Sequence, residues 1–273
     1  MNRLQQIEFN ILKEFVSVCE RYGLKYWLVC GSALGAVKYG GFIPWDDDID
    51  VALPRKDYER LLAVADEAFG EGLFLQNFGS EPEFPFIYSK LIDTRTTYVE
   101  AARSAFNIKQ CVFIDVFPLD GYPRKRKRLF ELKKAFYVRL MSSAFAGKSR
   151  AKALLTFPLK AAAKAVGMKR LVRGYSRLVS SNPLEDSGLW CNFGNSRLKV
   201  EYAPRSQYGD GTRASFESLS VVVPENYDAY LTQKYGKWRE DLPESEKKGH
   251  HGYILFDPDR PWGDESVKAQ DTL

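Results

Sequence analysis

The most constraining feature of the sequence is the acidic run WDDDIDV at residues 45–51, which leads into an apolar segment. If this run is extended, Asp48 and Asp50 leave the same face of a strand, with their Cα atoms about 6.6 Å apart. Two carboxylates on one half-buried face repel each other unless cations lie between them, and a pair of divalent ions about 3.5–4 Å apart would satisfy both. The pattern therefore predicts a divalent-metal site at Asp48 and Asp50.

Two other interpretations of this acidic run exist. Asp46 and Asp47 are equally well explained as solvated loop residues that cap or orient the next segment of the chain. A calcium-binding loop would use Asp46, Asp48 and Asp50 as its first three ligands. Its sixth position requires glycine, however, and this chain has Val51 there, which argues against such a loop.

An apolar segment that ends in small residues precedes the acidic run. Residues 27–30 are predicted to form a strand, and Gly31-Ser32 then turns into a short helix. A small residue and a hydroxyl suit a helix N-terminus, where free backbone N–H groups collect anions. We therefore expect Gly31 and Ser32 to bind a phosphate.

A further acid interrupts the apolar segment CVFIDVFPLD at residues 111–120. An unpaired buried carboxylate is costly, so Asp115 is expected to have a cation as partner. If this strand neighbours the one predicted for Asp48, roughly 4.8 Å away, Asp115 completes a three-carboxylate metal cluster. A capping or salt-bridged Asp115 is the alternative. Asp120 precedes a glycine and is predicted to be a turn residue.

The segment GSALGAVKYGGFIPWDDDIDVALPRKDYERLL, residues 31–62, strongly resembles the LicD family of phosphorylcholine transferases, which are related to fukutin and fukutin-related protein. Gly-Ser followed by an Asp-hydrophobic-Asp run also resembles the signature of the nucleotidyltransferase fold, whose third acid comes from a strand such as the one with Asp115. The resemblance covers roughly residues 24–120 and 216–251, and it leaves the segment between them unmatched.

This resemblance implies metal-dependent transfer of phosphocholine, or a similar phospho-alcohol, from CDP-choline or another CDP-activated donor, with release of CMP. The acceptor would be a hydroxyl of a cell-surface glycan or its lipid-linked precursor, such as lipopolysaccharide or teichoic acid. Asp48, Asp50 and Asp115 would be catalytic and would bind Mg²⁺ or Mn²⁺. Asp115 is also the candidate base for the acceptor hydroxyl.

Further residues are candidates for contacts with the donor. Phosphate contacts are expected from Gly31, Ser32, Lys38, Lys90, Arg95 and His250. For the last three, an exposed surface residue is an equally good interpretation. An aromatic cage for trimethylammonium would draw on Trp45, Tyr26, Phe42 and Tyr88. The family often has Arg-His where this chain has Lys38-Tyr39, so the choice of donor or acceptor can differ.

Charge is distributed unevenly along the 273 residues, whose net charge is +5. Residues 122–180 contain seventeen lysines and arginines and one acid, so this segment carries +16 and the remainder is acidic. Helices are predicted at 124–145, 151–166 and 169–180, with a kink at Pro158. This basic face suits an anionic membrane surface, or it is an ordinary exposed face. Nucleic acid is not favoured, because no platform of interleaved aromatic residues is visible.

Taken with the resemblance, the sequence predicts an α+β fold with a nucleotidyltransferase-like mixed sheet flanked by helices. Residues 1–121 are expected to form the catalytic core, 122–180 a basic helical insert, and 181–273 the part that completes the catalytic domain. No apolar run is long enough to span a bilayer, and the N-terminus is unlike a secretory signal. A cytoplasmic protein, peripheral on the inner face of the cell membrane, is therefore expected.

Two alternative functions stay open. A true nucleotidyltransferase would add a nucleotide to its acceptor and release pyrophosphate. A non-catalytic, membrane-associated protein would bind an anionic glycan or lipid. The four cysteines are widely spaced and form no Cys-x-x-Cys pair, so neither a disulfide framework nor a zinc ribbon is predicted.

Overall fold

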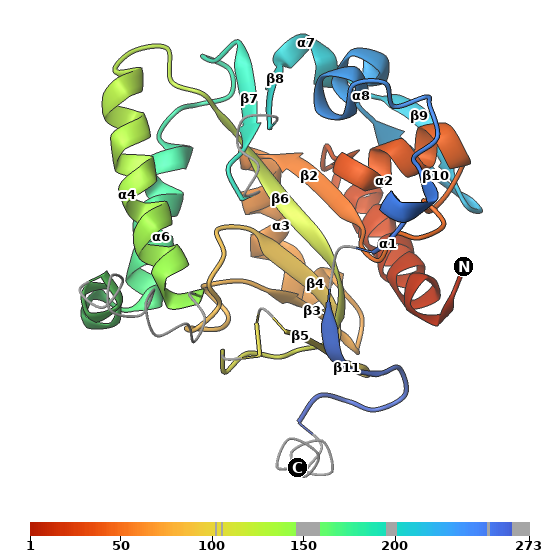
Figure 1. Ribbon diagram of the computed structural model, residues 1–273, viewed down its shortest axis with the longest axis horizontal. Helices are drawn as coiled ribbons and strands as arrows, with labels where there is room; N and C mark the ends of the chain where they lie inside the picture. The colour runs from red at the N-terminus through yellow and green to blue at the C-terminus, as the bar shows by residue number, and fades with distance from the viewer. Residues whose placement is uncertain (102, 105, 146–158, 195–200, 250–251, 264–273) are drawn as a thin grey trace.

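The computed structural model describes residues 1–101, 103–104, 106–145, 159–194, 201–249 and 252–263. In this part of the chain, a seven-stranded mixed sheet lies at the centre (Figure 1). Five strands follow one another in the order β1-β2-β6-β4-β3, while β7 pairs with the end of β6 and with β8. Their bounds are β1 Trp27–Leu28, β2 Asp50–Pro54, β3 Leu73–Gln76, β4 Ser89–Asp93, β6 Val112–Gly121, β7 Leu189–Asn192 and β8 Tyr202–Pro204. The expected mixture of helices and a mixed sheet is confirmed.

Helices and two further strand pairs surround this sheet. In Figure 1, α1, α2 and α8 gather on one side, whereas α4 and α6 run side by side on the opposite flank. The helices are α1 Arg3–Tyr22, α2 Cys30–Leu34, the π-helix η1 Gly35–Tyr39, α3 Arg55–Ala68, α4 Lys127–Phe145, α6 Met168–Ser180, α7 Arg205–Tyr208, α8 Tyr227–Tyr235 and the 3₁₀ turn η3 Glu244–Glu246. The additional pairs join β9 Thr212–Phe216 to β10 Leu219–Val223, and β5 Thr97–Glu100 to β11 Tyr253–Asp257.

Helix α1 follows directly from its sequence. Its apolar residues fall on one stripe that packs against β6, and Phe15 is fully buried. The Asn2 side chain accepts a hydrogen bond from the Gln5 N–H, and the Gln5 side chain accepts one from the Asn2 N–H, which is a capping box. Gly23 ends the helix in the left-handed conformation, with φ 59°. The amphipathic pattern of the sequence and its two capping signals thus account for the whole helix.

Strand β6 is the strand on which the sheet is built. All of its residues, Val112–Gly121, are buried. It pairs in parallel with β2, where Asp115 lies opposite Asp50, and antiparallel with β4, where the same Asp115 lies opposite Lys90. The Asp115 strand therefore neighbours the strand that begins at Asp50, although Asp48 itself lies before that strand.

Asp120 is not a turn residue, so that prediction is wrong. It lies within β6, and its side chain is 1% exposed. Arg55, the first residue of α3, donates two hydrogen bonds to its carboxylate, from Nε to Oδ1 at 2.8 Å and from Nη2 to Oδ2 at 2.6 Å. This long-range ion pair outweighs the local Asp-Gly turn signal, and it ties the start of α3 to the sheet.

Two apolar segments are shorter as strands than their patterns suggest. The strand predicted at 27–30 ends at Leu28, because Cys30 already begins α2, with a positive φ of 54°. The apolar segment 216–223 is part of a hairpin, in which Glu217 has φ 54° in the turn between β9 and β10. A left-handed residue in each place reverses or bends the chain where the apolar pattern suggested a continuous strand.

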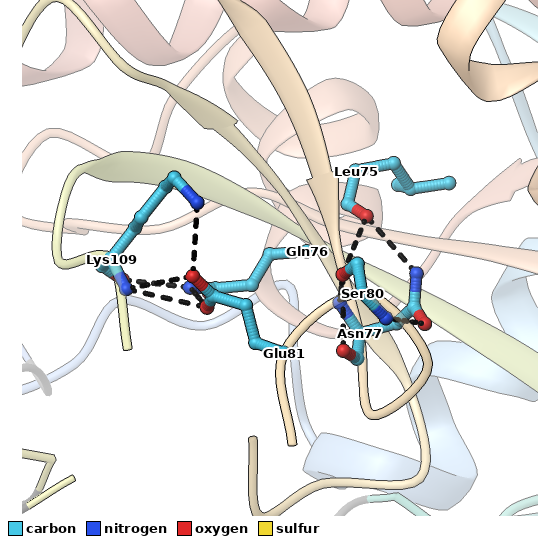
Figure 2. A network of polar contacts seen from close by, with 6 residues as sticks. All are labelled: Leu75, Gln76, Asn77, Ser80, Glu81 and Lys109. Carbon is cyan, nitrogen blue, oxygen red and sulfur yellow. Dashed lines mark hydrogen bonds and ion pairs between the residues drawn. The ribbon is translucent and has the colours of Figure 1, made fainter. Parts of the chain in front are cut away.

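A polar network fastens the segment after β3 to the segment before β6 (Figure 2). Gln76 Nε2 donates to Glu81 Oε2 at 2.5 Å and to the Lys109 carbonyl at 2.7 Å. Lys109 Nζ in turn lies 3.1 Å from Glu81 Oε1, and the Asn77 N–H donates to Ser80 Oγ at 2.9 Å within the turn. Because Gln76 is fully buried, these bonds satisfy its amide nitrogen and hold the edge strand in place.

Two of the helices predicted in the basic segment are confirmed. Helix α4 begins at Lys127 and α6 at Met168, close to the expected starts. Residues 159–166 are helical, whereas Pro158 and its predicted kink lie outside the described residues. None of the described helices combines the length and the hydropathy needed to cross a bilayer.

Replacing Asp120 by alanine is expected to lower the free energy of unfolding by about 3–5 kcal/mol, because the Arg55 guanidinium would be left buried without its counter-charge. Urea unfolding followed by circular dichroism measures this change. Lys56→Ala, which removes the exposed ion pair with Glu185, is the control and should leave the unfolding curve essentially unchanged. An Asp120→Ala protein as stable as the parent would contradict the role of this ion pair.

Candidate active site

Three neighbouring strands place charged side chains at one level of the sheet. Asp50 is the first residue of β2, Asp115 lies opposite it on β6, and Lys90 lies opposite Asp115 on β4. Residues that are paired in this way point to the same face of a sheet. Lys90 Nζ lies 2.6 Å from Asp115 Oδ1, and all three residues are buried. The sheet therefore presents two carboxylates and an ammonium side by side.

The small-residue turn is fastened to Asp50 by two backbone contacts. The N–H of Asp50 donates to Ser32 Oγ at 2.8 Å, and the N–H of Val29 donates to the Asp50 carbonyl at 3.0 Å. A Cβ on Gly31 would lie 2.7 Å from Asp46 Oδ2, so glycine allows the Asp46 carboxylate to approach the backbone where α2 begins. Gly31 and Ser32 are not a turn before the helix as predicted, because they lie in the first turn of α2 itself, where they face both ends of the acidic run.

The other acids of the run lie directly before β2. Asp46, Asp47 and Asp48 each offer a carboxylate oxygen, and these oxygens lie within 4.8 Å of one another. Because β2 begins at Asp50, Asp48 is not on a strand face with it as predicted, although its charge acts on Asp50. Asp46 is buried rather than solvated. Clustered carboxylate oxygens are the ligands that hard divalent cations prefer.

Asp50 has the surroundings of a carboxylate that requires a cation. Burial raises the pKa of Asp50 well above its ordinary value of 3.8, and the charges of Asp48 and Asp115 raise it further. A hydrogen bond from Cys30 and the charge of Lys234 oppose this shift. Ionising Asp50 is therefore costly in the protein alone, whereas a neighbouring divalent ion would favour the ionised form.

Lys90 belongs to a second layer of buried charge beside Asp115. Its Nζ lies 3.9 Å from Glu100 Oε2, and Glu100 also forms an ion pair with Arg103. Arg103 is 2% exposed, and its Nε and Nη1 have no hydrogen-bond partner among the described residues. Lys90 Nζ and Arg103 Cζ both lie over the Phe113 ring, 3.2 and 4.9 Å from its centroid. A buried guanidinium with unused N–H donors can bind a phosphate or carboxylate ligand.

Helix α8 closes the site from the C-terminal part of the chain. The Tyr230 hydroxyl accepts a hydrogen bond from the backbone N–H of Cys30 at 3.1 Å, across 200 positions of sequence. Lys234, one turn further along α8, forms a buried ion pair with Glu201 at 2.5 Å. Helix α8 thereby holds the start of α2 and brings a positive charge close enough to act on Asp50.

Comparison with known proteins shows to which domain family the acidic residues belong. Residues 23–149, which include the Gly-Ser turn and the acids on β2 and β6, match the LicD/FKTN/FKRP nucleotidyltransferase domain. The chain is also 29% identical over 279 aligned positions to lipopolysaccharide cholinephosphotransferase LicD of Haemophilus influenzae, covering 92% of this chain and 97% of that protein. Residues 23–149 form a LicD-family domain.

A shorter similarity links this LicD-family domain to a human protein. Over 42 residues the chain is 48% identical to ribitol 5-phosphate transferase FKRP of Homo sapiens. That match covers 15% of this chain and 8% of FKRP. It is therefore a similarity of one segment, whereas the similarity to LicD extends over nearly the whole of both chains.

Two cations predicted to contact phosphate in the LicD-family domain have protein partners. Lys38 Nζ, on η1, donates to the Glu240 carbonyl at 2.8 Å and lies 3.0 Å from Asp241 Oδ1. Arg95 follows β4 and pairs with Asp93 at 2.7 Å. Lys38 thus fastens η1 to the loop after α8, and Arg95 stabilises the turn after β4. Of the predicted cations, Lys90 is the one that the structure brings next to a predicted acid.

The four aromatic candidates for a choline cage each pack against a different ring: Tyr26 against Phe15, Phe42 against Phe216, Tyr88 against Phe117, and Trp45 against Tyr39. Tyr26, Phe42 and Tyr88 all lie in the hydrophobic core. Burial raises the pKa of Tyr88 well above its ordinary value, and the charge of Asp115 adds to this shift, so Tyr88 is close to the site. Lys247 Nζ lies 5.2 Å from the centroid of the Trp45 ring. His250 lies outside the described residues.

Sequence reasoning missed three charged residues of the candidate site: Glu100, Arg103 and Lys234. A signal for two of them exists in the segment TYVEAAR at residues 97–103, where an acid and a base three positions apart follow an apolar strand among small residues. Lys234 carries no such signal, because a lysine on a helix is normally exposed. Only the fold brings it to Asp50.

Asp50→Asn is expected to make the protein more stable than the parent at pH 7.5 in the presence of chelator. Folding raises the pKa of Asp50, so the parent loses stability as the pH rises from the ordinary carboxyl range, near 3.9, towards the raised value. The amide does not ionise and removes this loss. Urea unfolding at pH 4.5, 6 and 7.5 measures the difference, which should widen with pH.

The matched control is Asp259→Asn, at an exposed carboxylate that pairs with Arg3. Its unfolding free energy should follow that of the parent at every pH, because exposed ion pairs contribute little. If the Asp50→Asn protein also parallels the parent across this range, the electrostatic description of Asp50 is wrong.

Proposed function

We propose that this protein transfers phosphocholine, or a similar phospho-alcohol, from a CDP-activated donor to a hydroxyl of a cell-surface glycan or its lipid-linked precursor, with release of CMP. CDP-choline is the proposed donor, and a lipopolysaccharide or teichoic acid is the proposed kind of acceptor. The class of reaction is supported by the relatives, one named a lipopolysaccharide cholinephosphotransferase and the other a ribitol 5-phosphate transferase. Both names describe transfer of a phosphorylated alcohol.

The observation that carries the proposal is the position of Asp50 opposite Asp115 on adjacent parallel strands, beside a turn that Ser32 fastens to Asp50. Lys90 pairs with Asp115, whereas Asp50 is buried close to the charges of both Asp48 and Asp115 and is expensive to ionise without a further cation. Phosphoryl transfer relies mainly on positioning and on stabilising charge, so this group of carboxylates beside Ser32 suits it.

Mg²⁺ or Mn²⁺ is the proposed cofactor. Asp48, Asp50 and Asp115 are proposed to hold the ion, since carboxylate oxygens are hard ligands and a cation would offset both the burial and the repulsion that raise the pKa of Asp50. Asp46 and Asp47, whose oxygens lie within 4.8 Å of one from Asp48, offer ligands for a second ion. When bound, the metal would neutralise developing charge on the phosphates.

Asp115 is proposed to accept the proton of the acceptor hydroxyl as that oxygen attacks the β-phosphorus of the donor. The bond between this phosphorus and the oxygen that bridges the two phosphates breaks, and CMP leaves with the bridging oxygen. Lys90 lies 2.6 Å from Asp115 and is proposed to bind an oxygen of the transferred phosphate. Arg103, beside Lys90, supplies planar donors for the second phosphate.

The Gly-Ser turn is proposed to orient the donor. Ser32 Oγ accepts its hydrogen bond from the Asp50 N–H, so the proton of the hydroxyl remains available to donate to a phosphate oxygen. Gly31 keeps the backbone open to close approach. Contacts of Lys38, Arg95 and His250 with phosphate, and a choline cage that includes Trp45 or Tyr88, stay predictions.

We also propose that residues 1–121 and 181–273 together form the catalytic domain, and that 122–180 is a basic helical insert. Strand β7 continues the central sheet by pairing with the end of β6, and α8 binds the start of α2. Both contacts support a single unit built from the two ends of the chain. The insert helices α4 and α6 stand together on one flank (Figure 1).

The proposed location is the cytoplasm, at the inner face of the cell membrane. Nucleotide-activated donors are made inside the cell, and lipid-linked glycan precursors are held in the membrane. An enzyme that joins the two would work where they meet.

Incubation with Mg²⁺, a set of CDP-alcohols and candidate glycan acceptors is expected to release CMP, which chromatography quantifies. Chelator should stop the release, and Asp50→Asn should lower turnover by more than about 100-fold because it removes a metal ligand. Asp259→Asn is the control and should behave like the parent.

Several outcomes of this assay would contradict the proposal. Full activity of the Asp50→Asn protein would reject the metal assignment. Release of pyrophosphate from a nucleoside triphosphate, with no CMP from CDP-alcohols, would identify a nucleotidyltransferase. Donor binding that does not depend on metal, without turnover, would identify a binding protein.

Arg103→Gln is expected to raise the KM for the donor by about 10- to 100-fold, because a charged hydrogen bond to phosphate contributes about 1.5–3 kcal/mol. Arg103→Lys keeps the charge and should recover part of the loss. Steady-state kinetics over a range of donor concentrations separates KM from kcat, and thermal unfolding checks the fold. A lower thermal midpoint with an unchanged KM would show that Arg103 serves only as the partner of Glu100.

A further inference from the structure

Helices α4 and α6 form a surface that the transfer chemistry does not use. They run side by side on the flank of the sheet away from α1 and α8 (Figure 1). One face of α4 packs inward, where the Phe130 ring lies 5.6 Å from that of Phe193, and Tyr137 stacks on Tyr175 at 6.1 Å. The other face of α4 points to solvent, and its composition is unusual.

Large apolar side chains follow this outer face. Leu129, Leu132 and Phe136 are 47%, 69% and 61% exposed, and their spacing of three and four residues places them on one stripe. A groove of about 600 Å³ lies beside the stripe, and α4 and α6 line it with Leu132, Phe136, Tyr137, Arg177 and Leu178. Contiguous exposed apolar surface of this kind marks a site of interaction with an apolar partner.

Cations surround the apolar stripe. Among the described residues, no acid forms an ion pair with them. Exposed side chains on the two helices include Arg128, Lys133, Arg139, Arg170, Arg173 and Arg177. The ion pairs of the described residues include none of these six. Glu131 is the one acid of residues 122–180, and Lys134 already binds it at 2.6 Å. The surface is therefore positive, and its own two helices cannot neutralise it.

We propose that this basic flank, defined as the stripe Leu129, Leu132 and Phe136 with the six cations around it, docks on a membrane rich in anionic phospholipids. The apolar side chains enter the boundary between headgroups and acyl chains, and the lysines and arginines face the lipid phosphates. Neither signal is strong alone, but an apolar anchor combined with a basic patch gives stable peripheral binding.

The chemistry of the basic flank favours lipid over other anionic partners. Five of the six cations are arginines, which protein interfaces also use, but the core of such an interface is depleted in charge and a protein partner would have to neutralise every exposed cation. Single-stranded nucleic acid is bound by aromatic platforms between cations, whereas leucines dominate here. The inference rests on the proposed function only in that a lipid-linked acceptor would lie in the same membrane.

Flotation of the full-length protein with vesicles tests this inference. The protein should float with vesicles of phosphatidylcholine containing 30% phosphatidylglycerol and stay at the bottom with phosphatidylcholine alone, and raising the salt to 0.5 M should weaken binding. The double substitutions Leu132→Ser with Phe136→Ser, and Lys133→Glu with Arg177→Glu, should each lower the partition coefficient at least about tenfold.

Matched controls lie elsewhere on the surface. Leu242→Ser changes an apolar residue that is 47% exposed, and Lys237→Glu changes an exposed lysine, so both should float like the parent. Thermal unfolding verifies that each variant is folded. Equal binding to neutral vesicles, unchanged binding of the flank variants, or a parent dimer that the flank variants dissociate would overturn the inference. Vesicle binding without CMP release would support membrane docking by the basic flank and contradict the proposed transferase activity.

Discussion

The peptide group of Asp50 is the joint on which the site depends. Its N–H donates to Ser32 Oγ and its carbonyl accepts from the Val29 N–H, so the small-residue turn and the acidic strand cannot move independently. Strand β6 pairs with β2 from Asp50 onwards and adds Asp115 at the same level. Because a buried N–H without a partner costs about 1–3 kcal/mol, this position needs the hydroxyl of Ser32.

The charges around this joint explain why a cation is proposed. Lys90 and Arg103 face Asp115 and Glu100, so this buried layer nearly balances by itself. Asp50 adds a further carboxylate, and burial together with the charges of Asp48 and Asp115 raises its pKa. Under the proposed function, a divalent ion would balance the charges of Asp48 and Asp50, so that both can ionise beside a donor with two phosphates.

Much of this arrangement could be predicted from the sequence, because it depends on local patterns. The apolar stripe of α1, the Gly-Ser pair and the isolated acid Asp115 can each be recognised from a few neighbouring residues. Asp120 was mispredicted because its partner, Arg55, lies 65 positions away and no local pattern reveals it. Asp48 was placed in a strand because the alternation of Asp and Ile suggested one, although pairing begins only at Asp50.

The charged residues that surround Asp50 and Asp115 could not be predicted from the sequence, for the same reason. Glu100 ends β5, Arg103 lies in the turn that follows it, and Lys234 comes from α8, so their relation to Asp50 exists only after the sheet and the C-terminal helix have assembled. The basic flank is an intermediate case. Its charge was visible in the sequence, but the exposure of Leu132 and Phe136, which distinguishes a docking surface from an ordinary basic face, required the packing of α4 on α6.

Isothermal titration of CDP-choline into the protein, with Mg²⁺ and with chelator, tests the metal assignment most directly. If Asp48, Asp50 and Asp115 hold the ion that the donor's phosphates meet, CDP-choline should bind at least about tenfold more tightly with Mg²⁺, and Asp50→Asn should abolish that difference while the protein stays folded. Equal affinity with and without Mg²⁺ in the parent, or an undiminished Mg²⁺ effect in the Asp50→Asn protein, would contradict the assignment.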